Sequence, residues 1–142
     1  MARIFLDANI FLYAIGGEGP YREPARAVLE AVGRGKLDGI TSSEVLQEIL
    51  HVRSRGMNVR DAASAVRAAA GLVADVLPVT QEDVLDACRF LDTYLTLGAR
   101  DALHAAVMKN AGVSVLVSVD RDFDVLPGLK RLDPNEALAL VD

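Results

Sequence analysis

Four acidic residues occupy positions from which they could share a divalent metal ion. Asp7 and Asp120 each come at the end of an apolar run, and Glu48 and Asp101 fall on predicted helices. Mg²⁺ and Mn²⁺ are hard cations that take oxygen ligands, so carboxylates gathered in one place are typical of metal-dependent phosphate chemistry. The elements that carry these residues decide whether they can meet.

The two apolar runs predict buried strands. Ile4-Phe5-Leu6 leads directly to Asp7, and Val115-Leu116-Val117-Ser118-Val119 leads to Asp120. In an open parallel sheet, ligands bind at the carboxyl ends of the strands, so both acids are expected at one edge. A lone acid in this position is as well interpreted as a turn or N-cap residue, but two together favour a site.

Glu44 and Glu48 lie four residues apart and share one face of a predicted helix. Thr41-Ser42-Ser43-Glu44 fits a capping box with the Thr41 hydroxyl as cap, and the helix is expected to run to about Arg55. Because this gives Glu44 a local role, Glu48 is the better site candidate. Asp101 falls in the first turn of a helix predicted over residues 100–110, where an acid also complements the helix dipole.

Three further polar residues are secondary candidates. Asn9 is expected to cap a short helix, and it could also orient Asp7 or a metal-bound water. Ser118 could hydrogen-bond a site carboxylate or simply be a small residue at a strand end. Asp122 could supply an outer-sphere carboxylate, although a solvated loop acid is the simpler interpretation.

The rest of the chain alternates between predicted helices and strands. Helices are expected over 22–34, from 58 or 61 to 71–74, over 80–96 and from 134 onward, and short strands at Ile40, over 76–79 and at Leu132. In the helix over 80–96, the apolar stripe Val84, Cys88, Leu91 and Leu95 predicts that Cys88 is in the core. This order predicts a three-layer α/β/α sandwich with a mostly parallel central sheet, formed as one domain over residues 1–142.

Composition excludes several classes of protein. The 142 residues are 51% hydrophobic and carry a formal charge of −5, which argues against a protein that coats nucleic acid nonspecifically. The single cysteine permits no internal disulfide, and the apolar start is interrupted by Asp7 before a signal peptide can form. No apolar run approaches the roughly 20 residues of a membrane span. These features favour a cytoplasmic protein.

Other catalytic motifs are missing from the sequence. It contains no G-x-S-x-G nucleophile elbow, no P-loop and no G-x-G-x-x-G. The mean hydropathy of +0.26 is high for a solitary soluble domain and hints at a surface covered by a partner.

Four segments in order resemble the motifs of PIN domains, which are small metal-dependent ribonucleases that include the VapC toxins of toxin–antitoxin pairs. The segments are Leu6-Asp7-Ala8-Asn9, Val45-Leu46-Gln47-Glu48, the stretch from Ala99 to Ala106, and Val117 to Phe123. The resemblance implies an acidic site of Asp7, Glu48, Asp101 and Asp120, with Asp122 secondary. It also implies an endoribonuclease that uses Mg²⁺ or Mn²⁺, acts on RNA phosphodiester bonds and has an antitoxin protein as partner.

Three alternatives remain open from the sequence. One is a PIN nuclease of RNA processing outside any toxin pair, and another is a PIN-like scaffold without activity. A third is a phosphotransferase of the haloacid-dehalogenase type, although Asn9 stands where that chemistry wants a second Asp. A homodimer is expected, and an antitoxin segment is expected across the alanine-rich helix from about Asp61 to Ala70 and the helix ending near Arg55.

Overall fold

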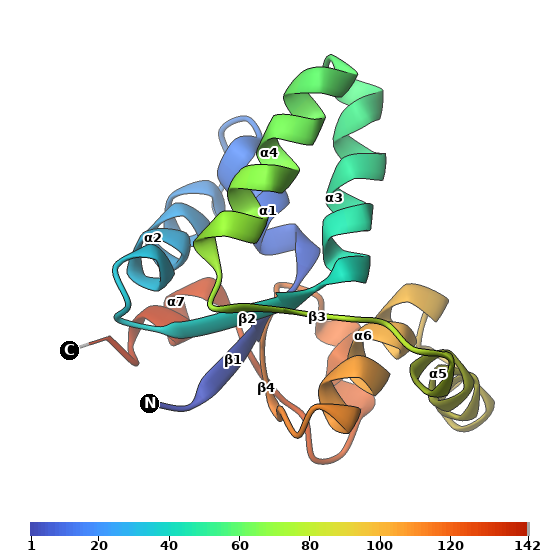
Figure 1. Cartoon of the computed structure of the whole chain (residues 1–142). Coiled ribbons are helices and arrows are strands. Elements are labelled where there is room, and N and C mark those ends of the chain that lie inside the picture. The colour runs from blue at the N-terminus through green and yellow to red at the C-terminus, as the bar shows by residue number, and fades with distance from the viewer. Residues whose placement is uncertain (142) are drawn as a thin grey trace.

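The computed structural model describes residues 1–141, which form a sheet with helices on both of its faces (Figure 1). The strands are β1 Arg3–Leu6, β2 Asp38–Ser42, β3 Asp75–Leu77, β4 Val115–Val117 and β5 Lys130–Leu132. The helices are α1 Ala8–Ile15, α2 Arg22–Gly33, α3 Ser43–Gly56, α4 Val59–Leu72, α5 Gln81–Thr93, α6 Ala99–Asn110 and α7 Pro134–Leu138, with a 3₁₀ helix, η1, at Arg121–Val125. Among the described residues, no helix is both long and apolar enough to cross a bilayer.

The five strands form one sheet in the order β3-β2-β1-β4-β5, and every neighbouring pair is parallel. The chain adds β2 and β3 on one side of β1 and then returns to add β4 and β5 on the other. The carboxyl ends of β1 and β4 are therefore adjacent where the direction of winding reverses, which is where ligands bind in open α/β sheets. The predicted three-layer fold with a parallel sheet is confirmed.

The helices divide into two layers. Helices α1 to α4 pack among themselves on one side, with the α3–α4 pair extending away from the sheet, whereas α5 and α6 pack together on the other (Figure 1). The core between the layers is apolar and includes the fully buried side chains Ile4, Phe5, Leu6 and Leu116. Burial of β1 on both faces explains its uninterrupted apolar run.

Two of the predicted helix caps are wrong by one or two residues. The second strand continues to Ser42, so Thr41 lies in it, and the Thr41 hydroxyl donates to the carbonyl of Leu6 at 2.9 Å. Ser42 is the N-cap of α3 and accepts from the Val45 N–H. At the first helix Asp7, and not Asn9, is the N-cap. Both true caps lie at the end of a strand, since Ser42 is the last residue of β2 and Asp7 directly follows β1. The local sequence pattern does not show where such a strand ends and the helix begins.

The predicted burial of Cys88 is also wrong, because α5 turns a different face to the core. Cys88 is exposed, whereas Asp83, Asp86 and Ala87 are buried. The Nδ2 group of Asn110, on α6, donates to Asp83 at 2.7 Å and to Asp86 at 3.1 Å. These hydrogen bonds satisfy the two buried carboxylates. The side of α5 that faces the protein therefore carries Asp83 and Asp86, and Cys88 of the predicted apolar stripe faces solvent.

Other predicted boundaries are confirmed. Asn58 caps α4, and Thr80 with Asp83 forms the capping box that begins α5. A second capping box, from Asp133 and Glu136, begins α7 with proline at its first position.

Candidate active site

Asp7 stands at the carboxyl end of the central strand and is almost entirely buried. Its Oδ1 accepts from the N–H of Ala8 at 2.8 Å, which caps α1. Its backbone N–H donates to the carbonyl of Val117 at 3.1 Å, so the ends of β1 and β4 are tied together. Burial raises the pKa of the Asp7 carboxyl, and the charge of Glu48 raises it further, although His104, Ser118 and the Ala8 N–H act in the opposite direction.

Ser118 links Asp7 to Asp120. The buried Ser118 hydroxyl donates to Asp7 Oδ2 at 2.6 Å and accepts from the backbone N–H of Asp120 at 3.0 Å. The Asn9 amide donates to Asp7 Oδ2 at 3.1 Å and to Ser118 Oγ at 3.0 Å. Asn9 therefore orients Asp7 without capping the helix. Its amide has no ionisable proton, so it cannot be the general acid that a phosphotransferase needs at this position.

Glu48 reaches the site from α3. Its Oε1 lies 3.1 Å from Nε2 of His104, on α6, and the same nitrogen is 3.8 Å from Asp7 Oδ1. Glu44, one turn earlier on α3, stays outside this group, and its Oε1 lies 3.6 Å from Arg100 Nε. The structure thus brings Glu48 to Asp7 and leaves Glu44 at the rim.

Asp101, Asp120 and Asp122 form the other part of the acidic site. Each offers a carboxylate oxygen within 4.8 Å of the others. Burial, followed by the hydrogen bonding and charge of Asp120 and the charges of Asp7 and Glu48, raises the pKa of Asp101 to about 8. The mutual effect of these groups places the four predicted acids in one electrostatic environment.

A cation from the edge strand fixes the loop that carries Asp120. Arg131, on β5, donates to Asp124 through Nε at 2.8 Å and to the Ser118 carbonyl through Nη1 at 3.1 Å. This contact lowers the pKa of Asp124. Asp124 therefore helps to hold the loop in place by pairing with Arg131. The backbone N–H of Asp122 instead donates to Asp120 Oδ1 at 2.9 Å.

The site residues fit a divalent metal ion. The donors are almost all carboxylate oxygens, which suit a hard divalent cation. Burial first, and neighbouring carboxylates after it, raise the pKa of both Asp7 and Asp101, and a bound cation would favour their ionised forms. Three described groups could contribute ligands on each side, Asp7, Glu48 and His104 on one and Asp101, Asp120 and Asp122 on the other.

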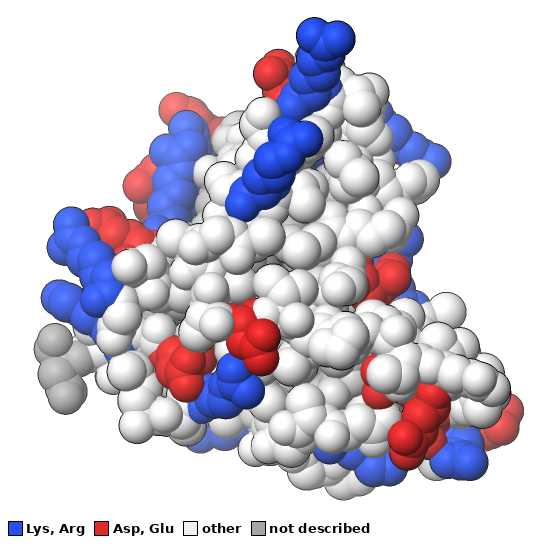
Figure 2. Space-filling view, in the orientation of Figure 1, with Lys and Arg blue, Asp and Glu red and all other residues white. Residues whose placement is uncertain are grey.

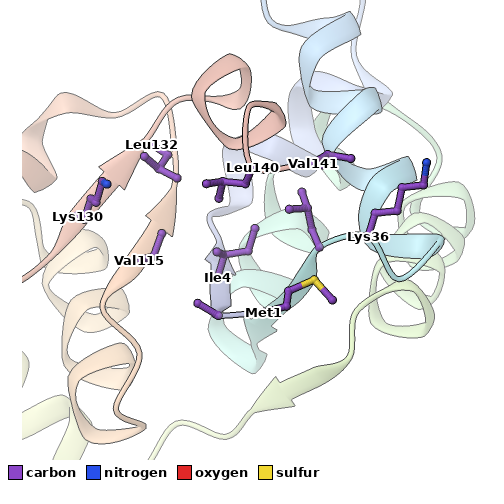
Figure 3. Close-up of a pocket in the computed structure, with 10 residues that line it drawn as sticks. Met1, Ile4, Lys36, Val115, Lys130, Leu132, Leu140 and Val141 are labelled. Carbon is purple, nitrogen blue, oxygen red and sulfur yellow. The ribbon is translucent and has the colours of Figure 1, made fainter.

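An apolar hollow of about 570 Å³, shown in Figure 3, has none of these acids in its lining. Ile4, Val115 and Leu132 line it from the sheet, and Lys36 and Lys130 are the charged residues in its lining. It has no carboxylate, hydroxyl or imidazole, so its size does not make it the chemical centre.

Sequence reasoning missed His104. The residue lies one turn after Asp101, and this spacing was the available signal, because residues three apart share a helix face. A lone histidine on an apolar helix is also compatible with core packing. Only the approach of α3 to α6 brings Glu48 to its ring.

The PIN domain family matches residues 4–129 of the chain, and the chain belongs to that family. Within it, the sequence is 43% identical to Ribonuclease VapC13 of Mycobacterium tuberculosis over 130 residues, which cover 91% of this chain and 98% of the relative. The particular group to which it belongs is therefore that of the VapC ribonucleases.

Solved structures share the fold at lower identity. VapBC2 from Rickettsia felis, bound to a DNA fragment from its promoter, superposes with a TM-score of 0.72 at 18% identity and covers 92% of this chain and 98% of its own. VapC20 of Mycobacterium tuberculosis, a toxin that cleaves the sarcin–ricin loop, gives 0.70 at 24% identity, covering 86% and 93%.

Proposed function

We propose that this chain is a metal-dependent endoribonuclease and the toxin of a VapBC-type toxin–antitoxin pair, with residues 1–142 forming one nuclease domain in the cytoplasm. The observation that carries the proposal is the convergence of Asp7, Glu48, Asp101 and Asp120 at the carboxyl ends of β1 and β4. VapC relatives at up to 43% identity support the substrate class.

The four acids are the residues that would hold Mg²⁺ or Mn²⁺. When bound there, such an ion would supply Lewis-acid chemistry, which would activate water for attack on the phosphodiester and would stabilise the leaving 3′-oxygen of the RNA. Asp7 is kept in one orientation by Ser118, Asn9 and the Ala8 N–H. Burial raises the pKa of both Asp7 and Asp101, to about 8 for Asp101, so a cation bound there would favour the ionised form of both acids.

Arginines near the α3–α4 pair could contact the RNA backbone. Arg53, Arg55, Arg60 and Arg67 lie on these two helices, and Figure 2 shows Lys and Arg side chains over the part of the molecule that they form. An acidic protein that binds RNA needs such a local cationic surface, because phosphate contacts supply most of the affinity.

Cleavage of single-stranded RNA tests the enzyme proposal. The purified chain is expected to cut RNA with Mg²⁺ or Mn²⁺, to stop in EDTA, and to resume when the metal is restored in excess. Asp101→Asn serves as the inactive control for contaminating nuclease. Full cleavage in EDTA, or equal cleavage by the variant, would contradict the proposal.

The partner is proposed to be an antitoxin segment that lies along the α3–α4 pair. An apolar hollow of about 190 Å³ between α1, α2, α3 and α4 supports this, with Phe11, Ile49 and Leu72 among its lining residues. An amphipathic segment would cover this surface and could place a Lys or Arg among the acids. Crosslinking to the copurified partner tests the placement, and contacts confined to α5 would contradict it.

The chain alone is proposed to form a homodimer. Exposed apolar side chains on the same two helices, among them Leu50, Val52 and Val59, support an interface that excludes water. Light scattering at high micromolar concentration is expected to give twice the mass of one chain. A strict monomer would contradict this part.

A further inference from the structure

His104 lies between the carboxylates of Glu48 and Asp7. Its side chain is 1% exposed, and its ring centroid lies 6.0 Å from that of Phe5, so the apolar core fixes the ring on one side. On the other side Nε2 lies 3.1 Å from Glu48 Oε1 and 3.8 Å from Asp7 Oδ1. The Nε2 edge of the ring therefore faces the two acids, and the Nδ1 edge is buried in the protein.

The buried edge determines which nitrogen of the ring carries hydrogen. Nδ1 is enclosed, and no group of residues 1–141 forms a hydrogen bond with it. A neutral ring with its hydrogen on Nδ1 would bury an unpaired donor and turn the bare Nε2 lone pair toward carboxylate oxygen, and both effects are unfavourable. A hydrogen on Nε2 removes both costs, because Nε2 then donates to Glu48.

We infer that His104 is a positioning residue of the nuclease site, which holds Glu48 at the metal by donating from Nε2 and does not bind the metal itself. The inference rests on the proposed function, since it assigns a role within the proposed metal site.

The hydrogen bond from His104 matters because few other groups hold the Glu48 carboxylate on the side of the site that faces Asp7. Glu48 reaches the site from α3, whose neighbours are α1 and α4, whereas its partner lies on α6 across the sheet edge. Arg100 Nε, at 3.8 Å from Glu48 Oε1, is half exposed and also faces Glu44. Without the His104 donor, this outer cation would draw the Glu48 carboxylate toward the rim and away from Asp7.

Metal affinity separates this role from packing. The experiment measures Mn²⁺ binding to the full chain by calorimetry and electron paramagnetic resonance, without RNA. His104→Leu replaces the imidazole with an apolar side chain of similar size and so removes the N–H donor. Mn²⁺ affinity is therefore expected to fall at least about tenfold. His104→Gln retains an N–H at a similar reach and is expected to stay within about threefold of the original.

Matched controls keep the outcomes distinct. His51, exposed on α3 one turn beyond Glu48, gives the control His51→Leu, which is expected to leave Mn²⁺ affinity unchanged. Thermal unfolding of each variant shows whether it is folded. Equal Mn²⁺ affinity in folded His104→Leu and the original chain would overturn the inference, whereas no Mn²⁺ binding by the original chain would overturn the proposed function.

Two spectra of the unsubstituted chain complete the test. Nitrogen-correlated NMR of the His104 ring is expected to find hydrogen on Nε2, and a bare Nε2 would overturn the inference even if His104→Leu fails to fold. Electron spin-echo spectra of bound Mn²⁺ are expected to lack coupling to a directly bound imidazole nitrogen. Such coupling would make His104 a ligand and overturn its assignment as a positioning residue.

Discussion

The hydroxyl of Ser118 donates a hydrogen bond of 2.6 Å to Asp7, although 111 positions separate the two residues in the chain. The same oxygen accepts from the Asp120 N–H, so one small side chain sets the position of two acids on adjacent strand ends. The parallel pairing of β1 with β4 makes this contact possible.

Ser118→Ala is expected to slow RNA cleavage by about 10–100-fold, because it releases Asp7 and Asp120 from their shared partner. The free energy of unfolding should fall by about 1–3 kcal/mol, since buried polar groups lose a hydrogen bond. Initial cleavage rates and urea unfolding measure the two effects. Ser64→Ala, at an exposed hydroxyl on α4, is the control and should change neither.

Glu48→Gln is expected to abolish cleavage with the fold intact, because it removes a charge from the site at nearly constant volume. Glu44→Gln should keep activity, since the ion pair that Glu44 forms among residues 1–141 is with Arg100 and not with the site acids or His104. Its effect on stability should stay within about 0.5 kcal/mol. Cleavage assays with circular dichroism of both variants check this pair. The reverse result would assign the site to Glu44.

Asp101→Asn is expected to stabilise the metal-free protein, and more at high pH than at low pH. Folding raises the pKa of Asp101 from 3.8 to about 8, so between these values the folded state holds a proton that the unfolded state has lost. The free energy of unfolding of the original chain must therefore fall as pH rises through this window. Urea unfolding in EDTA at about pH 5 and about pH 8 should show a smaller fall for the variant. An equal or larger fall would contradict the raised pKa.

Asn110→Ala is expected to lower the free energy of unfolding by about 1–3 kcal/mol. The substitution removes the amide that donates to both Asp83 and Asp86, and these carboxylates stay buried in α5. Thermal or urea unfolding measures the loss. Asn135→Ala, at an exposed position in α7, provides the comparison and should be close to neutral.

Much of the architecture follows from local pattern. The apolar run before Asp7 predicted β1, and helices expected from residues 80 and 134 are present as α5 and α7, each begun by a capping box. Strand ends at one sheet edge also put Asp7 and Asp120 in the same region. These signals can be recognised in the sequence because each depends on residues within a few positions of one another.

The errors have a common physical origin in partners that are distant in sequence. Asp83 and Asp86 of α5 are buried and accept hydrogen bonds from Asn110 on α6, so an apolar stripe through Cys88 predicted the wrong side of the helix. The Thr41 hydroxyl donates to the Leu6 carbonyl of the neighbouring strand, so Ser42 and not Thr41 caps α3. His104 gains its role only when α3 and α6 meet.

Asp7 has two roles, because the carboxylate in the acidic site is also the N-cap of α1. In a genetic selection for cells that survive the toxin, substitutions at Asp7 without a capping side chain would remove activity and about 1 kcal/mol of stability together. Such alleles would be recovered with reduced protein levels, because stability losses of this size lower abundance in cells. Inactive alleles at Glu48 should accumulate normally. The abundance of surviving alleles would thus distinguish a residue that supports the fold from one that serves the site alone.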